Sequence, residues 1–280
     1  MRTTEWVLAS LLVLAFLPGG IALARVWLSV DYYSHGFLVP LFALWVATWD
    51  RRGWRRQALV REPRGTALLA GAIGVYALGL GAGVTLLQGV ALVAAVGGAV
   101  LYLWGGRGLR DLAFPVAFLL FMVPLPASWL NPLIVELQLL VSSAALRLLH
   151  AFDFTIAREG NVLLLPGGES LFVSEACSGI TSLVVLTPLA VALAYLGERT
   201  WVGRLVVVAA AVPAAMLGNL VRVLVTAVAA DAYGVERATG NVLHEFAGLL
   251  TFTLSCLLLI GVGPLLRQLS RARGREAPPS

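Results

Sequence analysis

The sequence predicts an all-α integral membrane protein with about eight transmembrane helices, an interfacial or re-entrant helix and a small extracytoplasmic β-like hairpin. Of the 280 residues, 59% are hydrophobic and 12% are charged, whereas an average soluble domain is about 25% charged. Apolar runs near or above ~18 residues, about the length of a membrane-crossing helix, recur along the whole chain. They are too many for a single cleaved signal peptide in front of a soluble domain. Arginines border these runs, and no large soluble domain remains.

The arginines set the expected orientation. All 20 basic residues are arginine and the formal net charge is +5. Fifteen lie at five places that border apolar runs: Arg2, residues 51–64, the pair Arg107 and Arg110, the pair Arg199 and Arg204, and the tail RQLSRARGRE. This is the positive-inside pattern of cytoplasmic loops rather than a nucleic-acid-binding patch. We therefore expect both termini in the cytoplasm, one multi-pass membrane domain over residues 1–266, and a disordered basic cytoplasmic tail over 267–280.

The expected spans alternate in direction, and the first one runs outward. Two of them are short for a bilayer that needs about 20 residues. The second can lengthen at its outer end through DYYSHG, and the fifth ends in PLP. The eight spans are residues 6–24, 36–49, 66–84, 86–104, 112–123, 180–196, 202–229 and 246–266.

Residues 131–152 are apolar but carry the polar side chains Glu136, Gln138, Ser142, Ser143 and Arg147. The flanking spans place both ends of this segment outside, so we expect an interfacial or re-entrant helix rather than a further crossing. The following stretch, REGNVLLLPGGESLFVSEACSG, alternates as a strand does and contains a PGG turn. It predicts a hairpin of two short strands on the outer face.

This topology brings three reactive side chains to one face of the membrane. Cys177 lies at the outer start of the sixth span, and His244 opens the eighth span from the same side. Arg222 follows Gly203 by 19 residues, about 28 Å along the seventh span. A base such as His244 can favour the thiolate of Cys177 and later protonate a leaving amine. Arg222 can stabilise the oxyanion formed when a peptide carbonyl is attacked.

Each of these residues also has a structural interpretation. Cys177 can be a small buried hydrophobe, Arg222 a snorkelling interfacial arginine, and His244 a hydrogen-bonding residue at a helix start. An arginine inside an apolar run on the outer side is costly, however, and favours a function. Cys256 lies too deep in the last span to reach Cys177 for a disulfide.

The sequence gives little support for metal or cofactor binding. HEFAG begins like the zinc-protease motif HExxH but has Gly248 at the position of the second histidine. With His35 and His150 as the other two histidines, a zinc site has too few ligands. No GxGxxG or GxxxxGK[ST] element is present, which leaves nucleotide binding without support. We expect no metal and no cofactor.

The chain resembles the exosortase/archaeosortase family of multi-pass membrane enzymes. The strongest matches are SEACSGI around Cys177, GNLVRV around Arg222 and HEFAG around His244. Supporting matches are YSHGFLVP, FLLFMVPLP and REGNVLLLPG, and together they span residues 33–248. The resemblance implies a cysteine transpeptidase or protease of the hydrolase class, with Cys177 as nucleophile, Arg222 as the essential arginine and His244 as the third member. Having histidine at this third position looks more like a bacterial exosortase than an archaeosortase.

The resemblance also implies a substrate class. Such enzymes process membrane-anchored proteins with a PEP-CTERM-type tail, which consists of a short motif such as Pro-Glu-Pro, a transmembrane helix and a basic cluster. The expected location is the cytoplasmic (inner) membrane, with the active site on the extracytoplasmic face. The acceptor is unknown and can be a lipid, a polysaccharide or water. Glu175 and Asn219 are possible supporting residues that orient His244 or Arg222.

Three points stay open at the level of sequence. Arg222 can bind either the oxyanion or a substrate carboxylate. The main competing interpretation is a non-catalytic membrane transporter or an assembly factor for surface polysaccharide, with Arg222 and His244 lining a polar path. A plain intramembrane protease that hydrolyses without transfer is the second alternative. The substrates, the acceptor and the oligomeric state are not revealed by the sequence.

Overall fold

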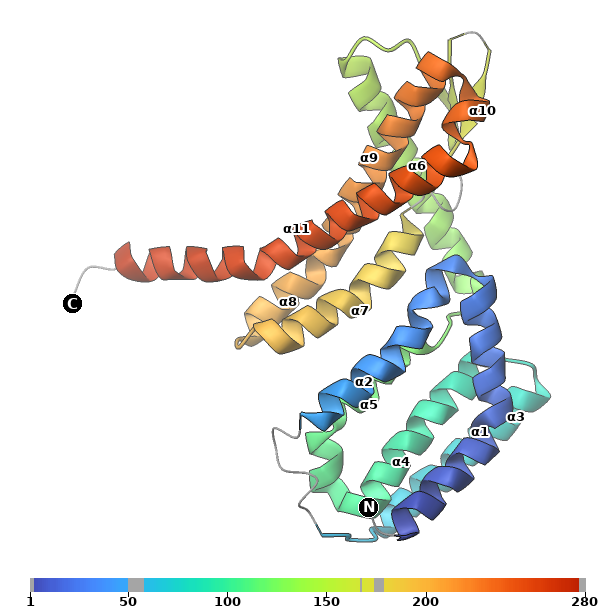
Figure 1. Ribbon diagram of the computed structural model, residues 1–280, viewed down its shortest axis with the longest axis vertical. Helices are drawn as coiled ribbons and strands as arrows, with labels where there is room; N and C mark the ends of the chain where they lie inside the picture. The colour runs from blue at the N-terminus through green and yellow to red at the C-terminus, as the bar shows by residue number, and fades with distance from the viewer. Residues whose placement is uncertain (1–2, 50–57, 167, 174–178, 277–280) are drawn as a thin grey trace. The chain divides into compact units, whose positions relative to one another are not determined.

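The computed structural model describes residues 3–49, 58–166, 168–173 and 179–276. The chain divides into two compact units, residues 1–126 and residues 127–280. Within the described residues the first unit is helical throughout (Figure 1). Its elements are α1 (Thr3–Ser29), η1 (Asp31–Phe37), α2 (Leu38–Thr48), α3 (Pro63–Gly81), α4 (Thr85–Asp111), α5 (Ala113–Phe118) and η3 (Leu119–Met122).

Helices α3 and α4 form a tight antiparallel pair. They are joined by three residues, of which Gly83 has a φ of +67° that favours glycine. Gly98 lies against Leu69, where an added Cβ would meet the backbone nitrogen at 3.1 Å. Phe16 of α1 stacks on Tyr76 of α3 with ring centroids 4.4 Å apart. The small residues therefore let these apolar helices approach closely, as membrane helices do.

The two short spans lie beside each other and are held by polar contacts. Phe42 of α2 packs on Phe118 of α5, with ring centroids 4.7 Å apart. The Tyr33 hydroxyl donates to the Leu125 carbonyl at 3.3 Å and accepts from the Leu125 amide at 2.8 Å. His35 is buried between two backbone carbonyl oxygens, one of them that of Phe121 at 3.2 Å. Two of the sequence motifs, YSHGFLVP and FLLFMVPLP, thus bind one another.

The second unit combines helices with a small sheet. In Figure 1, α7, α8, α9 and the first half of α11 run beside one another, whereas α6 crosses α9. A kink at Ala210 separates α8 from α9, close to Pro213, which lacks a backbone donor. The elements of this unit are α6 (Ala127–Ala151), β1 (Ala157–Glu159), β2 (Val162–Leu164), β3 (Ser170–Phe172), α7 (Ile180–Gly197), α8 (Trp201–Ala209), α9 (Ala211–Tyr233), α10 (Val235–Ala238) and α11 (Asn241–Glu276).

The sheet has three antiparallel strands in the order β1-β2-β3. The prediction of a two-stranded hairpin was therefore wrong in strand number. Leu163 pairs with Arg158 on one side and with Leu171 on the other. Leu163 and Leu171 are buried in a cluster that also contains the α9 residues Val223 and Ala227. The additional strand is β1, and its pairing with β2 gives the three strands that a small stable sheet needs.

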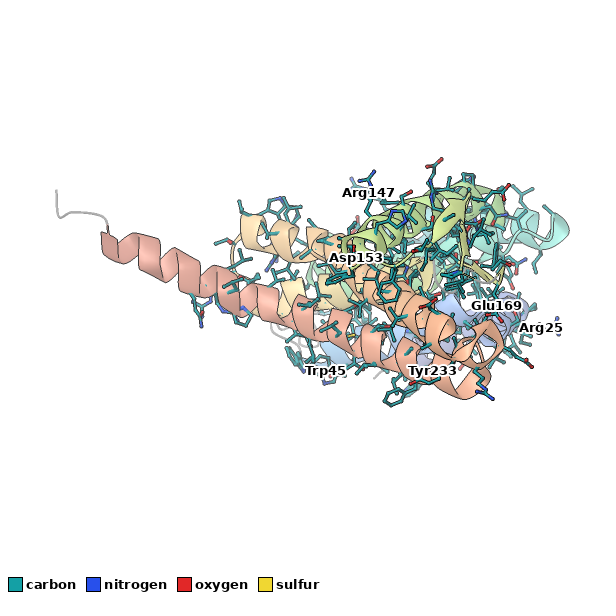
Figure 2. All side chains as sticks on the ribbon, turned by 90° about the horizontal axis from the view of Figure 1, so that it is seen from above. Arg25, Trp45, Arg147, Asp153, Glu169 and Tyr233 are labelled. Carbon is teal, nitrogen blue, oxygen red and sulfur yellow. The ribbon has the colours of Figure 1, made fainter. Side chains whose placement is uncertain are left out.

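The all-α multi-pass class is confirmed. Among the described residues, seven helical segments are long and apolar enough to cross a membrane. Large apolar side chains also project outward, including Trp45 at 45% exposure and Tyr233 at 68%, both labelled in Figure 2. The exposed apolar surface is that of a protein surrounded by lipid. The seven segments are Ala9–Ser29, Pro63–Gly81, Thr85–Asp111, Ala127–Ala151, Ile180–Gly197, Trp201–Tyr233 and Phe246–Gln268.

The short spans, α6 and the tail can be compared with the expected segments. The second span is lengthened by η1, as expected, whereas the fifth comprises only the ten residues of α5 and η3. Helix α6 is continuous over 25 residues and is itself a candidate span, so its interfacial placement stays a prediction. Residues 267–276 continue α11 instead of forming a disordered tail. The first of these residues, Arg267, forms an ion pair with Glu198 that is described below.

Candidate functional site

Close packing of α9 on α11 positions Arg222. Gly218 lies against Thr251 and Ser255 of α11, so that an added Cβ would be 2.8 Å from the Thr251 carbonyl oxygen and would overlap the Ser255 hydroxyl. Small residues on both helices therefore allow the two backbones to approach. Arg222 lies one turn further along α9, on the side that faces the start of α11.

The guanidinium group of Arg222 lies on Gly248. An added Cβ at Gly248 would be 3.2 Å from Nη2, 3.3 Å from Cζ and 3.6 Å from Nη1 of Arg222. These similar distances show that the flat face of the guanidinium covers the glycine. His244 belongs to the same helix, one turn (about 6 Å) before Gly248. Its side chain is outside the described part of the structure, so the structure places only its backbone in the first turns of α11.

The segment that carries the cysteine enters α7 through Gly179. This residue has a φ of +87° and is the N-cap of α7. An added Cβ at Gly179 would be 3.4 Å from Cβ and 3.5 Å from Nδ2 of Asn219, whose side chain is buried. Asn219 precedes Arg222 by three residues and so lies on a neighbouring part of the same helix surface. Cys177 and Glu175 lie outside the described residues.

A second set of contacts fixes the other end of the cysteine segment. The Asn161 side-chain amide donates to the Gln138 side-chain oxygen at 3.2 Å and to the Val173 carbonyl at 3.4 Å. The Val173 amide donates in turn to the Asn161 carbonyl at 3.0 Å. Gln138 is a buried residue of α6. The polar positions in the apolar run 131–152 thus include one that holds the sheet.

The turn between β2 and β3 is attached to the start of α10. The Glu169 carboxylate accepts a hydrogen bond from the Val235 amide at 2.9 Å. It therefore supplies an acceptor to a helix N-terminus, where a negative charge is favourable. Because α10 connects α9 to α11, this bond ties the sheet to the two helices that carry Arg222 and His244.

Four positioning residues were not among the predicted site residues. They are Gln138, Asn161, Gly179 and Gly248. A signal existed for three of them, because Asn161, Gly179 and Gly248 lie inside the quoted motifs REGNVLLLPG, SEACSGI and HEFAG. Gly248, which excluded the HExxH zinc motif, is the position on which the guanidinium lies.

The remaining cysteine has a packing role. Cys256 is a free, half-buried thiol of α11. It packs against a cluster of buried apolar residues of α7, α9 and α11 that includes Leu186, Ala215 and Leu259. It therefore behaves as a small hydrophobe. Among the described residues, no group of three histidine, cysteine or acidic side chains could hold a metal ion.

The fold and these contacts define a multi-pass helical membrane protein with an arginine at the contact between α9 and α11. Comparison with family models assigns the chain more narrowly: the transmembrane exosortase model matches residues 27–261. The chain belongs to this family. Neither a search of curated proteins nor a search of solved structures finds a match.

Proposed function

We propose that the chain is an exosortase-like cysteine transpeptidase or protease in which Cys177, Arg222 and His244 act together. One observation carries the proposal. Within one turn of α9, Asn219 contacts Gly179, two residues after Cys177, and Arg222 contacts Gly248, one turn after His244. These two contacts bring Gly179 and Gly248, which belong to the cysteine and histidine motifs, to the α9 segment that carries Arg222, and this supports the proposal.

The proposed reaction begins at the thiol of Cys177. His244 takes the thiol proton, and the thiolate attacks a peptide carbonyl of the substrate. Arg222 stabilises the negative oxygen of the tetrahedral intermediate, where a fixed cation in a partly buried place is effective. As the intermediate collapses, His244 protonates the leaving amine, which departs with the substrate's membrane helix. The thioester left on Cys177 is then resolved by an acceptor amine or hydroxyl, or by water.

The proposed substrates are membrane-anchored proteins with a C-terminal sorting signal, consisting of a short motif, a transmembrane helix and a basic cluster. The basic cluster of such a tail matches the positive-inside rule, which would place its short motif at the outer face of the cytoplasmic membrane. Glu175 and Asn219 are supporting residues in this proposal. The contact of Asn219 with Gly179 favours a role for Asn219 in holding the cysteine loop.

The test uses a reporter protein that ends in such a tail, taken from the same genome as the chain and co-expressed with it. Wild-type protein is expected to shorten the reporter, whereas Cys177→Ala is expected to leave it intact while folding and inserting normally. Processing that survives Cys177→Ala would exclude the cysteine mechanism and favour the transporter or assembly-factor alternative. Mass spectrometry of the shortened reporter distinguishes transfer from hydrolysis, since an unmodified C-terminal carboxylate means hydrolysis.

A further inference from the structure

A cavity lies at the end of α7 that is remote from Gly179. Helix α7 has 18 residues, so its two ends are about 27 Å apart. The cavity has a volume of about 420 Å³, and α7, α8 and α11 all contribute to it. Its lining includes Glu198, Arg199, Thr200, Val202, Val206 and Arg267.

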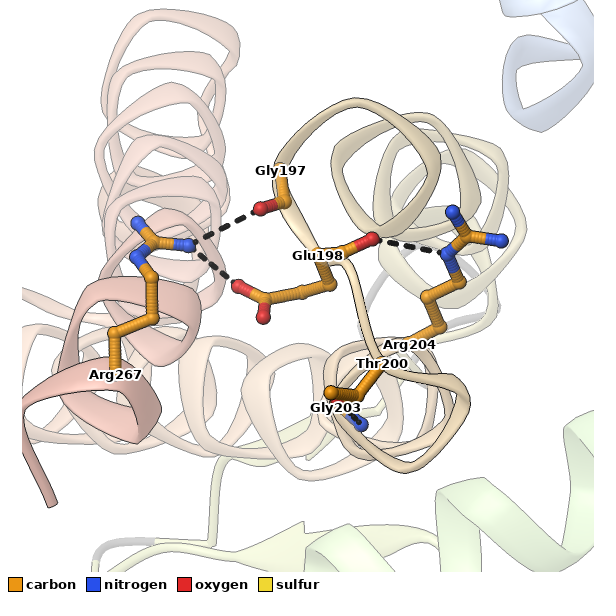
Figure 3. Close-up of polar contacts among 6 residues, drawn as sticks. All are labelled: Gly197, Glu198, Thr200, Gly203, Arg204 and Arg267. Carbon is orange, nitrogen blue, oxygen red and sulfur yellow. Dashed lines mark hydrogen bonds and ion pairs between the residues drawn. The ribbon is translucent and has the colours of Figure 1, made fainter. Parts of the chain in front are cut away.

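The negative charge in this cavity is already compensated. Arg267 donates from Nη1 to the Glu198 carboxylate at 2.5 Å, and Arg204 donates from Nε to the Glu198 carbonyl at 3.0 Å (Figure 3). The carboxylate fits between the helices because Gly203 and Gly263 have no side chains. An added Cβ would be 3.0 Å from its Oε2 at Gly203 and 2.8 Å from its Oε1 at Gly263. Glu198 is therefore a fixed partner of Arg267 rather than a free carboxylate.

Positive charge remains at the mouth of the cavity. Arg199 is exposed, and the Arg267 side chain is 46% exposed although it forms the ion pair. Two arginines and one glutamate give the lining a net charge of +1. The tail arginines that follow Arg267 in α11 add further positive charge to this end of the helix.

Apart from Thr200 and two glycines, the rest of the lining is apolar. Val202 is 70% exposed, and Val206 and Leu266 continue the apolar wall along α8 and α11. Trp201, next to the cavity, is 71% exposed. An exposed tryptophan beside arginines is typical of the level where a helix meets the lipid headgroups. The cavity therefore combines a cationic mouth with an apolar wall.

We propose that this cavity binds the headgroup of an anionic glycerophospholipid from the surrounding bilayer. The phosphodiester lies at Arg199 and Arg267, and an acyl chain lies along Val202, Val206 and Leu266. Basic pockets between membrane helices select anionic headgroups in this way. The apolar wall favours a membrane lipid over a free phosphate ion, which would leave it uncovered.

The test measures binding to the purified full-length protein in a neutral detergent. Phosphatidylglycerol, phosphatidylcholine with the same acyl chains, and inorganic phosphate are titrated separately, and bound lipid is counted by native mass spectrometry. Phosphatidylglycerol is expected to bind more tightly than phosphatidylcholine. Arg199→Gln is expected to weaken phosphatidylglycerol binding about fivefold, which corresponds to about 1 kcal/mol for one basic residue, whereas Arg199→Lys keeps most of it.

The matched control is Arg147→Gln, which removes an exposed arginine that points away from α6 (Figure 2). It is expected to leave phosphatidylglycerol binding unchanged. Equal binding of the two lipids, or equal effects of Arg199→Gln and Arg147→Gln, would overturn the proposal. Inorganic phosphate binding as tightly as phosphatidylglycerol would overturn it as well, because the apolar wall would then have no part in recognition.

Discussion

Gly248 provides the surface on which the Arg222 guanidinium lies. A methyl group there would be 3.2 Å from Nη2 and 3.3 Å from Cζ, so Gly248→Ala should displace the guanidinium by a few tenths of an ångström or more. Alanine is otherwise the better helix former by about 1 kcal/mol, and the protein should not lose stability. We expect reporter processing to slow by about tenfold or more, as misplaced catalytic groups do.

The measurements are the initial rate of reporter processing and the thermal unfolding midpoint in the same detergent. Gly261→Ala is the matched control, because Gly261 is in the same helix and has nothing within 4 Å of an added Cβ. It should leave processing unchanged. If the two variants process the reporter equally, the contact with Arg222 has no part in the reaction.

Gly179 combines a left-handed backbone conformation with a contact, and the effects of an alanine on each can be separated. Gly179 and Gly168 have nearly the same φ, +87° and +89°, but only Gly179 lies against another side chain, that of Asn219. Each alanine substitution should cost about 1 kcal/mol of unfolding free energy, because alanine disfavours the left-handed region. Only Gly179→Ala should also reduce processing. Denaturant titration and the reporter assay measure these quantities, and a Gly168→Ala variant that is equally inactive would attribute the loss to strain alone.

At the scale of elements, the sheet is connected to α6 through the amide of Asn161. Asn161→Asp keeps the shape of the side chain but replaces its two donated bonds, to Gln138 and Val173, by contacts between acceptors. A lost bond to a buried acceptor costs about 1–3 kcal/mol. We expect faster proteolysis within residues 157–173 and slower reporter processing. A variant with the protease resistance of the wild type would show that the apolar cluster alone holds the sheet.

The sequence predicts helices well where an apolar run has the length of a span, and less well where the outcome depends on tertiary partners. The expected end of the fourth span at residue 104 coincides with a kink at Gly105, whose φ is +66°. In contrast, nothing local to 157–159 distinguishes a third strand from a loop, because β1 is defined only by its pairing with β2. The ion-pair partner of Arg267 is likewise not predictable locally, because Glu198 is 69 residues away.

The same distinction applies to the candidate site. Residue chemistry and the positive-inside pattern led to the prediction of Arg222, whereas Asn219 was named only as a possible supporting residue. Gly248 lies in a quoted motif and Gln138 was noted as a polar position in an apolar run, but the sequence does not show which residue either one contacts. Only the packing of α9 on α11, and of the sheet on α6, gives these two residues their roles.

At the scale of the whole molecule, the direction of each span depends on the short ones. The bonds between Tyr33 and Leu125 place the end of the fifth span beside the start of the second. The two segments therefore run in opposite directions, as the predicted topology requires. In the predicted topology five crossings precede α6, so that α6 begins outside. It must also end outside if the arginine-rich tail of α11 is to lie in the cytoplasm.

This placement of α6 can be tested by labelling from outside the cell. Single cysteines at Ser128 and Thr155, both exposed residues that flank most of α6, are introduced into a chain carrying Cys177→Ser and Cys256→Ser. We expect both to react with a membrane-impermeant maleimide in intact cells. A cysteine at Ala58, next to the arginine cluster, should react only after permeabilisation.

Labelling at Ser128 but not at Thr155 would show that α6 crosses the membrane. Every later helix would then be inverted, and the site around Arg222 and Gly248 would face the cytoplasm. The basic end of α11 would lie outside, against the positive-inside rule. Because the sheet, α7 and α9 pack on one another through Leu163, Val223 and Asn219, they must move to the new side together. One pair of labelled positions therefore decides the orientation of the whole candidate site.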